Sequence, residues 1–238
     1  MNTTAVGPRV SLRLAAWLLL VGQLLYIVVT QFHAGGDANN HHEIFAKYAG
    51  SGNWTIVHIG QFASMAILLA GLLTLYPTLG RDPGAPGWAG RLGAAAAAAT
   101  LALYGALQAV DGVALKQAVT AWATAPEAEK AARFATAEAI RWIEWGLRSY
   151  QDFALGLALL LFAAALVCVA WLPRLIAYLM GLSGLAYLVQ GWVAGSEGFT
   201  PTQSGAIVLA WVLSLVWMIW LVVVASRMQE SGDVGAHL

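Results

Sequence analysis

Six apolar stretches, each long enough to cross the hydrocarbon core of a membrane, constrain this chain more than any other feature of its sequence. They lie near residues 12–32, 55–76, 90–110, 149–171, 175–194 and 205–226. A helix of about 20 apolar residues spans the roughly 30 Å of a bilayer core. The chain is 60% hydrophobic and 10% charged, whereas soluble domains carry about 25% charged residues. The sequence therefore predicts an all-α integral membrane protein, a six-helix transmembrane bundle that forms a single domain over residues 1–238.

The segments between the apolar stretches are typical of loops, with one exception. Residues 35–40, 77–87 and 195–201 are rich in glycine, proline and small polar residues. The exception is the connection between the third and fourth stretches, where Pro126 precedes two glutamates and an alanine-rich run. Proline in the first turn and acidic residues near the positive end of the helix dipole indicate a helix start. We therefore predict an amphipathic interfacial helix over about 126–148 that runs on into the fourth span.

The distribution of basic residues favours a cytoplasmic location for both termini. Cytoplasmic loops of membrane proteins carry an excess of lysine and arginine. The short loops on the opposite side hold only Lys47, and the long third connection holds five basic residues interleaved with acids. We predict a multi-pass plasma-membrane protein whose first apolar run is a retained helix, too long for a signal peptide. The basic residues assigned to the cytoplasmic side are Arg9, Arg13, Arg81, Arg91, Arg174 and Arg227.

Net charge, cysteine content and motifs exclude several classes of protein. The formal net charge is zero, so no basic footprint indicates nucleic-acid binding. Cys168 is the one cysteine, which excludes an intramolecular disulfide framework and a multi-cysteine metal site. The sequence contains no nucleophile elbow, phosphate loop or dinucleotide glycine fingerprint. The lipid bilayer is the one partner that the composition requires.

Polar side chains gather near the outer ends of the predicted helices. His58 and Gln61 are three residues apart, as are Gln108 and Asp111, so each pair shares a helix face. Polar groups are unfavourable in lipid, so these faces are expected to point toward one another inside the bundle. The sequence thus predicts a polar cavity in the outer half of the bundle. The residues predicted to line it are His58, Gln61, Gln108, Asp111, Lys116, Glu138, Arg141, Glu144, Arg148 and Gln190.

Four kinds of chemistry remain open for this region. A transition-metal site drawn from the histidines near the first loop is one, with His33, His42 and His58 as the predicted ligands and Asp37 and His41 nearby. Haem ligation by His33 and His58 is a second possibility. The third is an acid–base or proton-relay site built on His58, Asp111, Lys116, Glu138, Arg141 and Glu144. The fourth is an aromatic binding surface drawn from the eleven tryptophans, although interfacial belts explain most tryptophans in such chains.

The function that these features favour is the binding of a small ligand, a lipid headgroup or an ion in the polar cavity. One alternative is a membrane-embedded metal-dependent or acid–base enzyme that uses His33, His42, His58, Asp111 and Glu144. A second alternative is a small transporter, and a third is a haem-binding membrane protein. The transporter hypothesis lacks matching polar groups in the cytoplasmic halves and a clear internal repeat. The pattern assigns no ligand, reaction, cofactor or oligomeric state.

Six stretches of the chain stand together as a recognisable pattern: residues 40–49, 57–62, 108–116, 141–146, 184–191 and 197–199. They resemble a widespread family of small bacterial six-helix integral membrane proteins, a domain of unknown function. The resemblance covers most of the chain. It implies the six-helix architecture and implies no reaction, substrate or cofactor.

Overall fold

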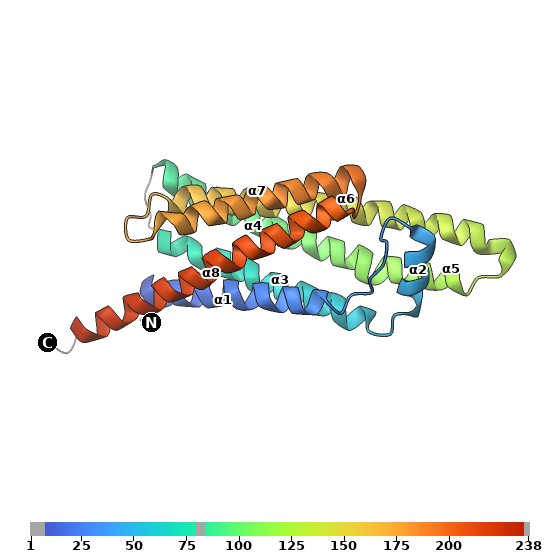
Figure 1. The fold of residues 1–238 in the computed structure, drawn as a ribbon, viewed down its shortest axis with the longest axis horizontal. Coiled ribbons are helices and arrows are strands. Elements are labelled where there is room, and N and C mark those ends of the chain that lie inside the picture. Colours follow the sequence, from blue (N-terminus) through green and yellow to red (C-terminus); the bar gives the residue numbers. More distant parts are fainter. Residues whose placement is uncertain (1–7, 80–83, 236–238) are drawn as a thin grey trace, which may run out of the picture.

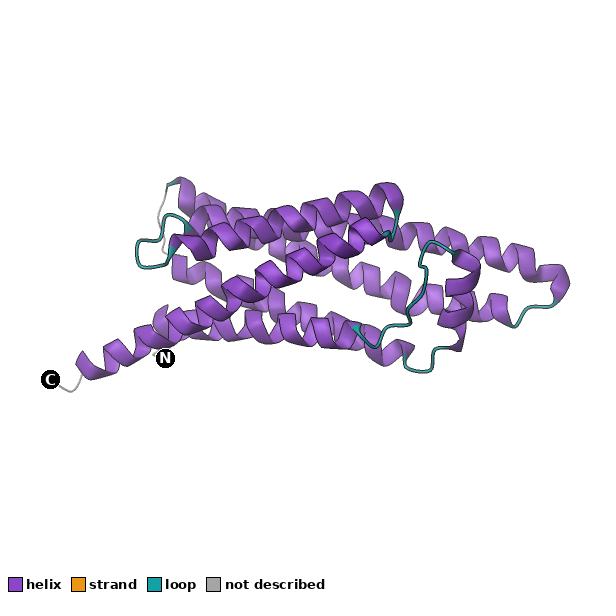
Figure 2. Ribbon diagram, viewed as in Figure 1, coloured by secondary structure: helices purple, strands orange, loops and turns teal. Residues whose placement is uncertain are grey.

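The described part of the protein is built from helices alone. A computed structural model describes the backbone of residues 8–79 and 84–235 and the side chains of residues 10–79 and 84–228. Figure 2 shows helices and loops, and no strand occurs in these ranges. The elements are α1 (Pro8–Thr30), α2 (His41–Gly50), α3 (Trp54–Leu75), η1 (Tyr76–Leu79), α4 (Ala85–Gln108), η2 (Ala109–Leu115), α5 (Lys116–Ala123), α6 (Glu127–Leu166), α7 (Arg174–Glu197) and α8 (Pro201–Gly235).

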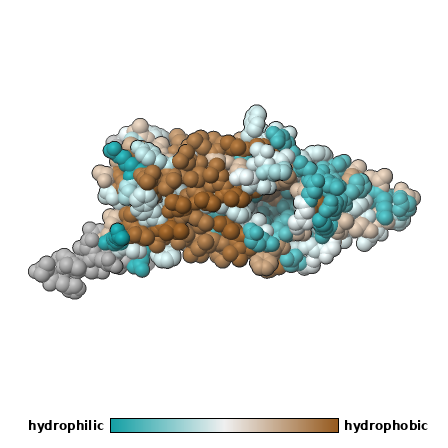
Figure 3. Space-filling model, viewed as in Figure 1, coloured by the Kyte–Doolittle hydropathy of each residue, from teal (hydrophilic) through white to brown (hydrophobic). Residues whose placement is uncertain are grey.

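Six helical segments of the described residues are long and apolar enough to cross a membrane. They overlap the six predicted spans one for one, which confirms the prediction of an all-α bundle with six candidate spans. Large apolar side chains such as Trp17, Ile59 and Val212 are exposed on the outside of the bundle. Figure 3 shows this apolar surface ending where hydrophilic residues take over. An apolar surface of this extent has lipid, not water, as its natural solvent.

The six long helices form a closed ring in chain order. Helix α1 packs on α3, α3 on α4, α4 on α6, α6 on α7, α7 on α8, and α8 returns to α1 (Figure 1). Small residues permit the closest approach: a Cβ atom built on Gly156 of α6 would lie 2.7 Å from the carbonyl oxygen of Gly184 in α7. Helix interfaces in membranes favour such residues because they let the backbones touch. The buried apolar core fills the ring along most of its length.

Two of the helical segments are much longer than a bilayer requires. Helix α4 continues without a break through η2 and α5, giving a segment of 39 residues, and α6 has 40 residues. A 40-residue helix is about 60 Å long, roughly twice the thickness of the hydrocarbon core. Residues 127–148, predicted as an interfacial helix, form the first half of α6 and continue its axis (Figure 1). The continuity into the fourth span agrees with the sequence, while the location at an interface stays a prediction.

Helix α2 was not predicted from the sequence. Asn40 caps it, because its side-chain oxygen accepts a hydrogen bond from the backbone N–H of Glu43 at 3.3 Å. This arrangement is half of a capping box. The helix buries Ile44, Phe45 and Tyr48 against α5 and the start of α6, which makes a second, smaller core. This core joins α2, α5 and the first turns of α6 into one layer at one end of the ring.

That end is called the polar end below, and it comprises residues 31–53, η2, α5, residues 124–148 and residues 198–204. Helix α1 begins and α8 finishes at the opposite end (Figure 1). Arg13, Arg91 and Arg174 lie near this opposite end, within the first two turns of α1, α4 and α7. Arg81 lies outside the described residues, as does the side chain of Arg9. The polar end and these three arginines therefore lie at opposite ends of the long axis of the bundle.

Candidate functional site

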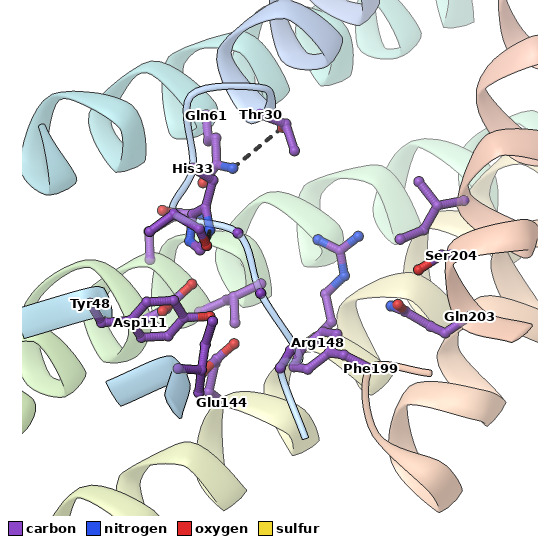
Figure 4. A pocket seen from close by; sticks show the side chains of 18 of the residues that line it. Thr30, His33, Tyr48, Gln61, Asp111, Glu144, Arg148, Phe199, Gln203 and Ser204 are labelled. Atoms are coloured by element: carbon purple, nitrogen blue, oxygen red, sulfur yellow. Dashed lines mark hydrogen bonds between the residues drawn. The ribbon is translucent and has the colours of Figure 1, made fainter. Parts of the chain in front are cut away.

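A cavity of about 290 Å³ lies inside the ring at the polar end. Helices α1, α3, α4, α6 and α8, the π-helical turn η2 and the loop after α1 all contribute to its wall, and α2 closes one side (Figure 4). Its polar and aromatic lining residues are Tyr26, Thr30, His33, Tyr48, Gln61, Tyr104, Gln108, Asp111, Arg141, Glu144, Arg148, Phe199, Gln203, Ser204 and Trp211.

Six of the ten residues that the sequence assigned to the cavity line it directly. They are Gln61, Gln108, Asp111, Arg141, Glu144 and Arg148. They come from α3, α4, η2 and α6, so the expected convergence of polar helix faces occurs. His58 is buried directly behind Asp111 and lines a second, mostly apolar hollow beside Phe62 and Gly112. The facing stripes on α3 and α4 therefore meet as their spacing indicated.

Lys116, Glu138 and Gln190 do not line the cavity. The ammonium group of Lys116 donates hydrogen bonds to the carbonyl oxygens of Tyr48, Ala49 and Ser51 at 2.6–2.9 Å. Lys116 thereby caps the last turn of α2, where carbonyl groups lack helical partners.

Glu138 and Gln190 have different surroundings. Glu138 accepts a hydrogen bond from the imidazole of His41 at 2.8 Å, on the side of α6 that faces α2. Gln190 is fully buried in α7, and neither polar atom of its side chain has a hydrogen-bond partner. Lys116 and Glu138 thus tie α2 to its neighbours, and Gln190 belongs to the helix packing.

Arg148 is the cation that reaches into the cavity (Figure 4). Its Nε donates to Oδ2 of Asp152 at 3.2 Å, and Nη1 donates to the hydroxyl of Tyr26 at 3.1 Å. Asp152 is buried, so the guanidinium group is the cation that balances this carboxylate. A guanidinium group has five N–H donors, and these contacts leave part of the fork facing the cavity.

Arg141 and Glu144 form a buried ion pair on one face of α6. Arg141 also donates to the carbonyl oxygen of Ala38 at 3.3 Å and lies over the ring of Phe199, 4.7 Å from its centroid. A buried pair of this kind holds its geometry because either charge alone is strongly unfavourable in a dry environment. Arg141 therefore fastens the loop after α1 and the α7–α8 connection over the cavity.

Helix α8 supplies a wall of the cavity that the sequence analysis missed. Gln203, Ser204 and Trp211 all line it. Gln203 is buried, and its amide nitrogen has no hydrogen-bond partner. Trp211 makes an edge contact with Tyr26, with ring centroids 6.2 Å apart. Residues 203, 207 and 211 are four apart, so they share one face of a helix. This spacing could have indicated the wall, but none of the three is charged, and no charged residue drew attention to this face.

His33, His58 and Asp111 form a tight cluster from three separate elements. Their possible ligand atoms all lie within 4.8 Å of one another, and Nε2 of His58 is 3.1 Å from Oδ2 of Asp111. The ring centroids of the two histidines are 5.1 Å apart, and Trp54 stacks on His58 at 4.5 Å. Burial lowers the pKa of His33, although the carboxylate of Asp111 opposes the shift, so burial favours the neutral form of the ring.

His42 does not belong to this cluster, contrary to its predicted role as a third metal ligand. It lies on α2, and its ring stacks on Phe134 with centroids 4.1 Å apart. Asp111 occupies the third position instead. Aromatic rings and the carboxylate of Asp111 surround His33 and His58, so the geometry fits a small ion between them better than it fits a haem.

Comparison of the chain with family models, with curated protein sequences and with solved structures found no match. The resemblance to the bacterial six-helix family therefore stays a prediction.

Proposed function

We propose that this multi-pass membrane protein binds a small molecule carrying an anionic group, a carboxylate or a phosphate, in the cavity at its polar end. One observation carries the proposal: the guanidinium group of Arg148 and the amide of Gln203 both line the cavity, and the amide nitrogen of Gln203 has no hydrogen-bond partner (Figure 4). Arginine forks match the planar oxygens of carboxylates and phosphates, often through two parallel hydrogen bonds.

The surroundings of Arg148 and Gln203 explain why they favour an external acceptor. Asp152 and Tyr26 hold the guanidinium group in place, so little side-chain entropy is lost when it binds a ligand. An unsatisfied buried donor such as Nε2 of Gln203 destabilises a protein by about 1–3 kcal/mol. An anionic oxygen between the two side chains would satisfy the amide and use the free part of the fork.

The opposite wall favours a ligand that also carries hydrogen-bond donors. Oε1 of Gln108 and Oδ1 of Asp111 are buried acceptors without partners. The cavity volume of about 290 Å³ lies at the lower limit for small-molecule sites, roughly 300 Å³. A compact polar molecule, or the headgroup of a lipid, matches this size and this separation of donors from acceptors.

The location of the protein completes the proposal. The exposed apolar band and the six candidate spans support a membrane location, and the arginines opposite the polar end support a cytoplasmic location for both termini. We place the protein in the plasma membrane as a member of the bacterial six-helix family, with the cavity facing outward. Residues 127–148 would then lie at the membrane interface and beyond it.

Thermal unfolding of the detergent-purified protein tests the ligand chemistry. Sodium phosphate and sodium acetate would be compared with sodium chloride at equal ionic strength. Binding to the folded state raises the melting temperature by mass action, so at least one of the two probes should raise it by a few degrees. Arg148→Lys keeps a cation beside Asp152 but removes the fork, and Gln203→Met removes the amide; each should abolish most of the shift. The matched control Arg133→Lys alters an exposed arginine of α6 and should respond like the wild type.

The same assay separates a soluble ligand from a lipid headgroup. Phosphatidylglycerol and phosphatidylcholine would be added in mixed micelles. Protection by phosphatidylglycerol alone, lost in Arg148→Lys, would identify the anionic group as part of a lipid. If neither the soluble anions nor the anionic lipid protects the wild type, or if Arg148→Lys responds fully, the proposal is wrong.

A further inference from the structure

We infer that His33, His58 and Asp111 bind a divalent transition-metal ion, of which Zn²⁺ is the test case, in the wall of the cavity. The three side chains come from the loop after α1, the second turn of α3 and the π-helical turn η2. This inference deepens the proposed function. It rests on that function in one respect, namely that the bound ion would face the ligand proposed to occupy the cavity. The site itself follows from contacts that Arg148 and Gln203 do not share.

The orientation of the two imidazole rings is the first argument. Nδ1 of His58 lies 2.8 Å from the carbonyl oxygen of Trp54, and Nδ1 of His33 lies 3.1 Å from that of Ala34. A carbonyl oxygen only accepts, so in both rings Nδ1 carries the hydrogen and donates it. In the neutral form of either ring the lone pair is then on Nε2. Metal-binding histidines almost always have this second contact, because it fixes the tautomer and the ring orientation.

The second argument is that two polar atoms of the cluster, one on His58 and one on Asp111, lack hydrogen-bond partners. Nε2 of His58 makes no hydrogen bond of good geometry although the side chain is only 4% exposed, and Oδ1 of Asp111 is buried without a donor. Buried polar atoms in native proteins are nearly always satisfied, and exceptions call for an explanation such as an ion. A cation between the rings and the carboxylate would satisfy both atoms at once.

The donor set indicates the class of ion. Two imidazole nitrogens and one carboxylate oxygen suit Zn²⁺, Fe²⁺ or Mn²⁺, whereas Mg²⁺ and Ca²⁺ prefer all-oxygen sites. Three protein ligands leave at least one coordination position for water or a substrate. His33 and Asp111 line the cavity, so this position would open onto the space in which the anionic ligand is proposed to bind.

Little movement is required to form the site. With metal–ligand bonds of about 2.0–2.1 Å, ligand atoms in a tetrahedral site lie about 3.4 Å apart. His58 and Asp111 already stand at 3.1 Å, and no pair in the cluster exceeds 4.8 Å. His33 is in a loop, so it can approach the other two, which α3 and η2 hold in place.

Metal retention by the full-length, tag-free protein in detergent tests the inference. After treatment with a chelator, the protein would be incubated with Zn²⁺, freed of excess metal by gel filtration, and analysed for bound zinc. We expect the wild type to retain one ion per chain. His33→Gln, His58→Gln and Asp111→Asn should each weaken zinc binding by more than about tenfold. Losing even an outer partner of a metal ligand weakens metal binding by about 10–100-fold, and these changes remove the ligands themselves. His42→Gln is the matched control, because it removes a histidine of the same end that lies outside the cluster.

Cobalt provides a second readout. Co²⁺ bound by nitrogen and carboxylate ligands in four- or five-coordinate geometry gives visible absorption bands, which should appear with the wild type and with His42→Gln and be absent from the cluster variants. Thermal unfolding of each variant without metal would show whether it folds. If His58→Gln does not fold, His33→Gln still tests the site, because His33 lies in a loop. Wild-type protein that retains no zinc, or cluster variants that retain as much as wild type, would overturn the inference.

The two proposals fail separately in these assays. Arg148→Lys should retain zinc while losing the response to the anionic probes. His58→Gln, which does not line the cavity, should keep that response when assayed without metal while losing zinc. A protein that binds zinc but no anion would contradict the proposed function alone, and one that binds the anion but no zinc would contradict the metal site alone.

Discussion

Gly112 approaches His58 so closely that it has no room for a side chain. A Cβ atom built on Gly112 would lie 2.9 Å from Cβ of His58 and 3.1 Å from Cγ of its ring. Gly112 lies in η2, one residue after Asp111. The π-helical turn therefore brings both the carboxylate of Asp111 and the bare backbone of Gly112 against His58. Such turns frequently mark functional sites. The position of His58 therefore depends on a residue that makes no polar contact with it.

Gly112→Ala should displace His58 and weaken zinc binding by about tenfold, comparable to the loss of an outer partner of a metal ligand. Zinc retention after gel filtration measures the effect. The matched control is Gly105→Ala in α4, where the added Cβ would meet Phe62 at an ordinary 3.5 Å. That change should leave zinc binding intact and slightly stabilise the helix, because alanine is a better helix former by about 1 kcal/mol. Equal zinc retention in the two variants would contradict the prediction.

The spans were predictable from the sequence because the thickness of a bilayer sets a simple length requirement. The polar face shared by Gln108 and Asp111 was also predictable, since helical spacing fixes which residues align. Helix α2 was not, because its ten residues are too few and too polar to form a span, although the Asn40 to Glu43 capping pattern was present. The sequence also could not show that α8 packs against α1 and closes the ring, which is what brings Gln203 to the cavity.

The choice of metal ligands shows the same limit. His33 and His58 are near the ends of adjacent helices, and their proximity was expected from the chain order. His42 and Asp111 were both reasonable third ligands, and the choice depends on the direction of α2. The small core around Phe45 sets that direction by turning His42 toward Phe134. Packing of this kind is decided by tertiary contacts that local spacing does not contain.

Lys116→Met should destabilise the protein without affecting the cavity. The lysine was predicted to line the cavity, but its three hydrogen bonds go to the end of α2 and the residue after it. A hydrogen bond to a charged group contributes about 1.5–3 kcal/mol, so the loss of all three should lower the free energy of unfolding by at least about that much. Lys130→Met, at an exposed ion pair with Glu127, is the control and should change stability by less than about 1 kcal/mol. An unchanged melting temperature in Lys116→Met would show that α2 does not need this cap.

Arg141→Gln and Glu144→Gln should each be strongly destabilising. Each leaves one buried charge without its partner, which costs about 3–5 kcal/mol, whereas the double variant removes both charges and should lose less than the sum. Arg133 and Glu129 form an exposed pair on the same helix, and the corresponding glutamine variants provide the matched control. Thermal unfolding in detergent measures all six proteins. Additive and small effects at Arg141 and Glu144 would mean that water reaches this pair.

The orientation of the bundle decides whether the cavity opens to the outside of the cell, and thiol labelling tests it. Cys168 is exposed, so the experiment starts from Cys168→Ala and places single cysteines at Gly52, in the polar end, and at Gly84, at the other end. Gly52 is exposed and a Cβ there would meet no atom within 4 Å, so the substitution should be tolerated. A membrane-impermeant thiol reagent applied to intact cells should label Gly52→Cys only, because the arginine-rich end is expected to face the cytoplasm.

Labelling after permeabilisation is the control, since both cysteines should then react. If Gly84→Cys alone reacts in intact cells, the bundle has the reverse orientation. The cavity would then open to the cytoplasm, and Arg148 would meet cytoplasmic anions. The geometry of Arg148, Gln203 and the histidine cluster would be unchanged by that result, because the ring of helices fixes it independently of the side of the membrane.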